Sequence, residues 1–144
     1  VRGVASLGRV AAVASERGPA PLEEHDERVG EALAGVVRNV LTTSGIALPY
    51  TGEAVTDLNG EAWRAQQYGH AQVRVPRAVW DSDAVELPAA SVGDPGASMA
   101  ALQVVLASRS LHRGYARGPH LLLTASDEYG HVGAAIVSYA LHPS

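Results

Sequence analysis

The chain has 144 residues, enough for one hydrophobic core, so we expect residues 1–144 to form a single domain. Hydrophobic residues make up 47%, which excludes a disordered tail, and no apolar run approaches the roughly 20 residues that span a bilayer. A net charge of −4 with scattered arginines argues against nucleic-acid binding, and the lack of cysteine excludes disulfides and thiolate chemistry on this chain. The opening residues, VRG, show no signal-peptide pattern, so we expect a cytoplasmic protein.

The first third of the chain predicts a strand followed by a long helix. Residues 4–15 (VASLGRVAAVAS) are rich in valine and alanine and predict a strand interrupted at Gly8. Residues 22–43 predict a helix, because valine and leucine recur at steps of three and four and form one apolar stripe. Ser44-Gly45 supplies its end. The first turns of this helix carry acidic residues that suit the positive end of the helix dipole: Glu23, Glu24, Asp26 and Glu27.

The middle of the chain predicts short elements separated by turns. Residues 46–57 (IALPYTGEAVTD) predict a short strand leading into a loop, and Asn59-Gly60 is a turn signal. Residues 61–68 (EAWRAQQY) predict a short helix. Residues 73–75 and 84–87 predict short extended pieces.

The last third predicts a buried helix and a hairpin. Residues 91–114 predict the helix, with Asp94 as its cap and Pro95 at its first position. Its segment LQVVLAS is apolar nearly all round, which is typical of burial on all sides. Residues 120–126 and 131–141 predict two strands joined by the turn DEYG. The order of elements indicates an α/β fold with a mixed sheet.

This order resembles the C-terminal half of the thiolase fold, in the β-ketoacyl synthase branch. Residues 54–68 (AVTDLNGEAWRAQQY) stand where synthases have a strand, the catalytic-histidine loop H-G-T-G-T and an acidic helix. Residues 91–114 resemble the segment in which a glycine–histidine pair opens a buried helix of small residues. Residues 121–140 resemble the final hairpin. The resemblance implies a thiolase-like half: a mixed sheet packed on helices, with one buried helix rich in alanine and glycine.

Both catalytic histidine positions of the family are replaced. The first falls near Asp57, in the loop DLNG, and the second falls on Asp94. The Gly/Phe-rich turn of synthases becomes SDEYG, and the family's nucleophilic cysteine belongs to the N-terminal half. The resemblance therefore implies that this chain carries no complete active site of its own.

The candidate catalytic residues are Asp57, Asn59 and Asp94. In a condensing enzyme two neutral histidines donate hydrogen bonds to the thioester oxygen, whereas an ionised aspartate would repel the developing anion. Asp57 and Asp94 would instead form a carboxylate pair, one acid and one base. The same residues suit a turn and a helix cap, and the sequence leaves both interpretations open.

The other polar residues indicate no cofactor and no metal site. Arg64 and Glu61 lie within one helical turn and predict a surface pair, with a role for Arg64 in holding an acidic group as the alternative. The histidines lack metal-ligand spacing, and GDPGAS lacks the lysine and spacing of a phosphate-binding loop. Trp63 and Trp80 are expected to be core or interface anchors.

The resemblance implies a divergent β-ketoacyl synthase-like protein that binds or transfers acyl thioester groups delivered by acyl carrier protein or acyl-CoA. The alternative is a non-catalytic pseudo-enzyme or structural partner subunit of an acyl-synthase complex, and the sequence does not decide whether catalysis survives. Because thiolase folds pack two similar halves together, the expected partner is an N-terminal thiolase-like half or a second copy of the chain.

Overall fold

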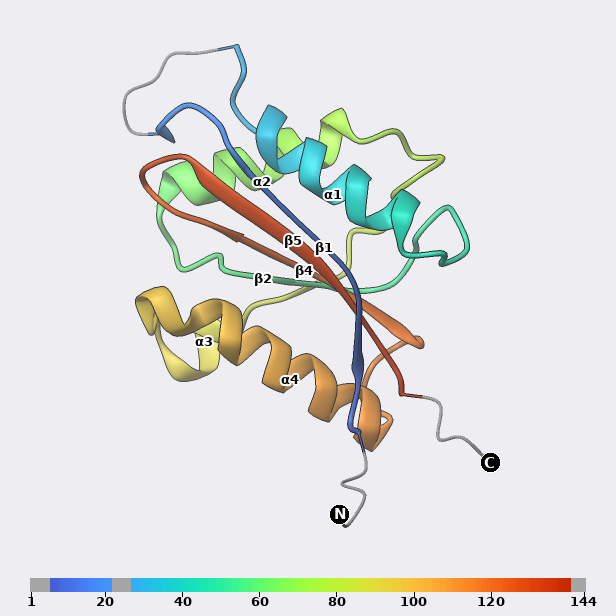
Figure 1. The fold of residues 1–144 in the computed structure, drawn as a ribbon. Helices are drawn as coiled ribbons and strands as arrows, with labels where there is room; N and C mark the ends of the chain where they lie inside the picture. Colours follow the sequence, from blue (N-terminus) through green and yellow to red (C-terminus); the bar gives the residue numbers. More distant parts are fainter. Residues whose placement is uncertain (1–5, 22–26, 141–144) are drawn as a thin grey trace.

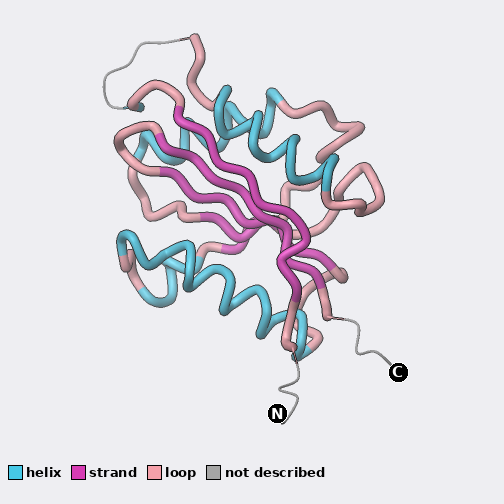
Figure 2. The backbone as a smooth tube through the Cα atoms, viewed as in Figure 1, coloured by secondary structure: helices cyan, strands magenta, loops and turns pink. Residues whose placement is uncertain are grey.

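The computed structural model describes residues 6–21 and 27–140. It consists of one mixed sheet with a layer of helices on each face (Figure 1; Figure 2). In chain order the elements are β1 (Arg9–Arg17), α1 (Glu31–Thr43), β2 (Ala54–Thr56), α2 (Ala62–Arg74), β3 (Val85–Glu86), α3 (Pro88–Val92), the 3-10 turn η2 (Gly96–Ser98), α4 (Met99–Arg113), β4 (His120–Ser126) and β5 (His131–Ser138).

The five strands lie in the order β1-β5-β4-β2-β3. β1 and β4 pair with β5 in the antiparallel sense, so the predicted final hairpin is confirmed. β2 pairs with both β4 and β3 in the parallel sense. The sheet is therefore mixed, as the sequence predicted. Three parallel strands in the middle and at one edge point their carboxyl ends to the same side of the molecule.

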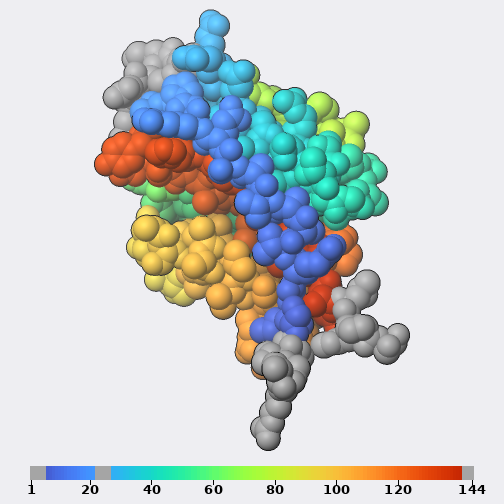
Figure 3. Space-filling view, in the orientation of Figure 1, coloured from blue at the N-terminus to red at the C-terminus, as the bar shows by residue number. Residues whose placement is uncertain are grey.

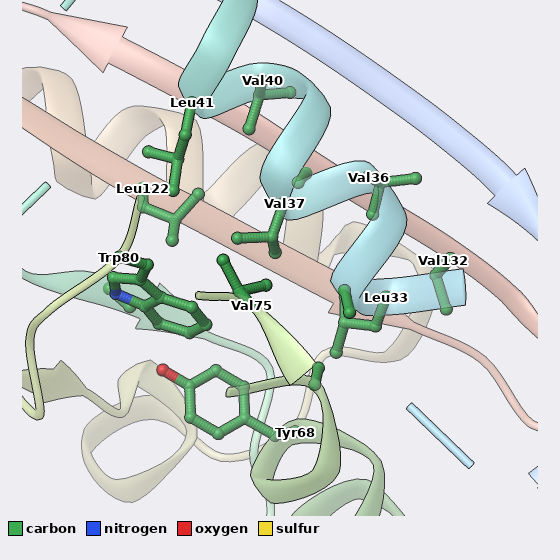
Figure 4. Close-up of a cluster of buried hydrophobic side chains, with 14 of the residues drawn as sticks. Leu33, Val36, Val37, Val40, Leu41, Tyr68, Val75, Trp80, Leu122 and Val132 are labelled. Atoms are coloured by element: carbon green, nitrogen blue, oxygen red, sulfur yellow. The ribbon is translucent and has the colours of Figure 1, made fainter. Parts of the chain in front are cut away.

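The larger hydrophobic core lies between the sheet and the pair α1 and α2 (Figure 4). The predicted stripe of α1 faces the sheet, because Leu33, Val37 and Val40 are all buried. Side chains of α2 and of the segment after it close the core from below, and the rings of Tyr68 and Trp80 meet edge to face with centroids 5.9 Å apart. Trp80 is thus a core anchor, as expected.

The second core lies between the sheet and α4, and it is smaller. The residues of α4 that are buried lie on one face only: Met99, Gln103, Ala107 and Leu111. The opposite face is open, and Val105 is 58% exposed. The predicted burial of this helix on all sides is therefore wrong for this chain by itself, because nothing in the described structure covers its outer face.

Two helices begin later in the structure than the sequence predicted. The helix expected over residues 22–43 begins at Glu31, after a turn that contains Glu27; Glu23, Glu24 and Asp26 lie outside the described residues. The helix expected over residues 91–114 is divided. α3 ends at Val92, because the next residue, Gly93, has φ of 76° and ψ of −174°, a backbone geometry that no helix continues through. The chain then passes through Pro95 and η2 before α4 begins at Met99.

The predictions for the middle of the chain were partly wrong. Residues 46–53 form a loop, and only Ala54–Thr56 of the expected strand pair with the sheet. Residues 73 and 74, expected to be extended, belong to α2, which is longer than predicted because Ala71 packs in the core. β3 and β4 were predicted at their observed places. Within residues 6–21 and 27–140, no helix has both the length and the apolar composition needed to cross a membrane.

Candidate functional site

The site lies where the loops after β2, β3 and β4 leave the sheet. These strands are parallel, with Thr56 opposite Thr124, so their carboxyl ends meet at one edge. Asp57 directly follows β2, Asp94 lies in the segment after β3, and Asp127 directly follows β4. Ligands in α/β proteins bind outside the carboxyl ends of such strands. Topology therefore gathers polar residues that lie far apart in the sequence.

Asp57 is the buried centre of this group. Its Oδ2 accepts hydrogen bonds from Ser126 N at 2.7 Å and from the Arg64 guanidinium, and Ser126 Oγ lies 3.3 Å away. Arg64 is only 13% exposed, and it also donates to the Ser126 carbonyl oxygen at 2.5 Å and to Glu61 Oε2 at 2.9 Å. This cluster ties the beginning of α2 to the ends of β2 and β4.

Asn59 joins the loop after β2 to the segment after β3. Its Nδ2 donates to Asp94 Oδ2 at 2.6 Å and to Glu61 Oε2 at 2.9 Å. Asp94 Oδ1 accepts the Gly96 N–H at 2.8 Å. Asp94 thus closes a tight turn just before α4, but α4 itself begins at Met99, with Ser98 at its N-cap position and no side-chain cap, so the predicted cap of the long helix is not formed.

The hairpin turn contributes a second polar pair. Asp127 Oδ2 lies 2.9 Å from His131 Nδ1, while Asp127 Oδ1 accepts the N–H groups of Tyr129 and His131, each at 2.9 Å. The side chains are 40% and 57% exposed respectively. The imidazole is thus held by a carboxylate at the edge of the site.

A cavity of about 490 Å³ lies between these loops and the beginning of α4. The hairpin turn and the beginning of α4 form its two rims (Figure 3). Its apolar wall includes Met99 and Ala100. The polar side chains on its wall are Asp57, Arg64, Asp94, Ser126, Asp127, Glu128 and His131.

The two candidate aspartates have opposite electrostatic environments. Burial raises the pKa of Asp57 above its ordinary value, although the Ser126 N–H and Arg64 oppose this. The Asn59 amide, followed by the Gly96 N–H, lowers the pKa of Asp94. Both line the same cavity, and each has its own hydrogen-bond partners.

The prediction for Arg64 needs correction. It pairs with Glu61, as expected from their spacing, but the pair is not simply a surface one, because the guanidinium is buried against Asp57 and stacks 4.4 Å from the centre of the Trp63 ring. Holding an acidic group, the alternative given for Arg64, is what the structure shows. Ser126 was missed, because a serine at a strand end carries no signal until the parallel strand beside it is known.

Among the described residues no group of three or more histidine and carboxylate side chains is arranged to hold a metal ion. His120 lies at the other end of β4 from the cavity, where its Nδ1 is hydrogen-bonded to Ser138 Oγ at 2.8 Å.

No protein-family model matches the sequence, and no curated protein matches it significantly. Solved structures do match. The ishigamide ketosynthase/chain length factor is 17% identical with a TM-score of 0.60, and the match covers 94% of this chain and 36% of that one. A type II PKS acyl-carrier protein in complex with its ketosynthase bound to the hexaketide matches with 10% identity and a TM-score of 0.62, over 93% of this chain and 34% of that one. The human mitochondrial 3-ketoacyl-CoA thiolase matches with 15% identity and a TM-score of 0.58, over 94% of this chain and 31% of that one.

The chain spans about a third of the length of these proteins. Identities of 10–17% establish a shared fold and nothing narrower. Because ketosynthases and a thiolase align over nearly the whole chain, the resemblance found in the sequence is confirmed at the level of the fold. The chain has a thiolase-like α/β fold that corresponds to one part of the ketosynthases and thiolases.

Proposed function

We propose that this chain forms one half of a divergent β-ketoacyl synthase-like protein, and that the cavity at the carboxyl ends of β2, β3 and β4 binds acyl thioester groups. Acyl carrier protein or acyl-CoA would deliver them. The observation that carries this proposal is the convergence of Asp57, Asn59 and Asp94. The resemblance to synthases puts the two aspartates at the catalytic-histidine positions, and both lie on the wall of one cavity.

The environments of the two aspartates support different roles. A raised pKa lets a carboxyl keep its proton to higher pH, so that it can donate one, and a lowered pKa keeps a carboxyl ionised, so that it can accept one. Asp57 would accordingly act as the acid and Asp94 as the base. Acyl transfer of this kind also needs a nucleophile, which this cysteine-free chain leaves to its partner half.

A second candidate is a non-catalytic partner subunit of an acyl-synthase complex. The specific observation in its favour is that Asp57 is ion-paired with Arg64 and accepts two further hydrogen bonds from Ser126. A carboxylate so engaged is well suited to holding three segments together. In that case the cavity would bind the acyl chain, or limit its length, without reacting with it.

The partner that we propose is an N-terminal thiolase-like half, seated on the open face of α4. An apolar groove of about 270 Å³ lies beside that face, between β1 and the flank of α4, and includes Val13, Val104 and Leu123. Val13 and Val105 are 68% and 58% exposed. The matched proteins are about three times longer than the chain, which leaves enough length in them for a covering half.

Intact-mass spectrometry of the full-length gene product with acyl-carrier-protein or coenzyme A thioesters tests the proposal. We expect a stable acyl adduct or turnover, and loss of turnover in the Asp57→Ala, Asp94→Ala double variant. Acyl binding without adduct or turnover would favour the non-catalytic subunit. No binding at all would overturn both functions.

Light scattering tests the partner. The separate chain is expected to associate with an added N-terminal half and to lose this association when Val105 is changed to arginine. A stable, monodisperse monomer that does not bind the N-terminal half would contradict the proposed interface. A homodimer that persists when the N-terminal half is added would show that a second copy of the chain occupies this face.

A further inference from the structure

The charge of the cavity wall limits which acyl groups fit. Four carboxyl groups line the cavity, against one guanidinium and one imidazole. The guanidinium of Arg64 is already used, because it is bonded to Asp57, to Glu61 and to the Ser126 carbonyl oxygen. Three of its five N–H donors are therefore engaged, and its single positive charge is already shared between two carboxylates of this chain.

The other three acidic side chains of the wall, unlike Asp57, have no guanidinium of the described residues bonded to them. Asp94 is bonded to the uncharged Asn59 amide and to a backbone N–H. Asp127 shares its carboxylate with His131, and Glu128 is exposed beside it on the hairpin turn. These three groups lie on the two rims of the cavity, Asp94 next to η2 and the others on the turn. A ligand entering between the rims meets negative potential from both sides.

We propose that this cavity selects neutral acyl groups and rejects acyl groups that end in a free carboxylate. The inference rests on the proposed acyl-binding function and adds its substrate class. Like charges brought together at a binding site oppose binding strongly, whereas Asp94 and Glu128 are well placed to accept hydrogen bonds from a hydroxyl or amide on a neutral ligand. Condensation of carboxylated acyl donors would then have to take place elsewhere.

Two nonhydrolysable pantetheine analogues of the same size test this: one ends in a malonyl carboxylate and the other in the corresponding carboxamide. Binding to the full-length gene product is measured by calorimetry at low and at high salt. We expect the carboxamide to bind roughly tenfold more tightly or better at low salt, and the difference to shrink as salt screens the rim carboxylates.

Variants assign the effect to the rims. The Asp94→Asn, Glu128→Gln double variant should bind the carboxylate analogue more tightly and so reduce the difference several-fold, while Glu86→Gln, outside the cavity wall, should leave it unchanged. Equal affinities, or tighter binding of the carboxylate, would overturn this inference alone. Failure of both analogues to bind would instead overturn the acyl-binding function.

Discussion

Asn59 Nδ2 donates to Asp94 Oδ2 at 2.6 Å, a hydrogen bond between residues 35 positions apart in the sequence. It closes the loop after β2 against the segment after β3 and holds Asp94 at the rim of the cavity. Two of the three site residues predicted from the sequence thus contact each other directly. The third, Asp57, lines the same cavity and is held there by Arg64 and Ser126.

Replacing Arg64 by methionine should be strongly destabilising. The substitution leaves the Asp57 carboxylate, 10% exposed, without its ion partner, and an unpaired buried charge costs about 3–5 kcal/mol. Urea unfolding measures the loss. Arg77→Met is the matched control, because Arg77 makes the same kind of bond to Asp81 but is 79% exposed, so it should cost about 1 kcal/mol or less. Equal losses in the two variants would show that burial does not govern the Arg64 pair.

Stability should fall in acid partly through Asp94. Its pKa is lowered in the folded chain, so the unfolded state binds the proton more readily, and the stabilisation present above the ordinary pKa is lost as pH falls through the folded value. We expect the free energy of unfolding to decline below about pH 4, and to decline less steeply in Asp94→Asn. Urea unfolding at a series of pH values gives both slopes. Identical slopes would contradict the role given to the Asn59 and Gly96 bonds.

Gly130→Ala should disrupt the hairpin turn. Gly130 has φ of +92°, and an added Cβ would lie 2.7 Å from the Pro19 carbonyl oxygen and nearer still to that of Gly18. Gly60→Ala is the control, since its φ is +94° and its Cβ would meet nothing within 4 Å. Backbone strain alone should cost Gly60→Ala about 1–2 kcal/mol. Gly130→Ala should cost clearly more by thermal or urea unfolding, and a difference near zero would contradict the close approach.

Gln103→Leu should weaken the contact between α4 and the sheet. Gln103 is 1% exposed, and its Nε2 donates to the carbonyl oxygens of Thr124 at 2.9 Å and Val55 at 3.4 Å. Leucine has similar volume but cannot donate, so we expect a loss of about 1–3 kcal/mol. Gln66→Leu, on the exposed side of α2, should change the unfolding free energy by less than about 0.5 kcal/mol. A stabilised Gln103→Leu protein would show that the carbonyl oxygens do not need this donor.

The sequence by itself determined the elements whose cause is local. The stripe of α1 follows from the spacing of its valines and leucines, and the strands at 120–126 and after 131 follow from an apolar run on each side of a polar turn. It also determined the fold, through the order of these elements, and it singled out Asp57, Asn59 and Asp94. Its errors in secondary structure lay at boundaries, such as the break at Gly93 inside an apparently continuous helical pattern.

Only the tertiary structure decided which of these residues share a site. Arg64 is buried because α2 begins beside the ends of β2 and β4, and this depends on the parallel pairing of those strands. The open face of α4 is likewise a tertiary property: its apolar sequence indicates burial, but the sheet covers one side only and leaves Val105 exposed. Periodicity along a chain reports which residues avoid water, whereas the partner that excludes the water is set by contacts between distant segments.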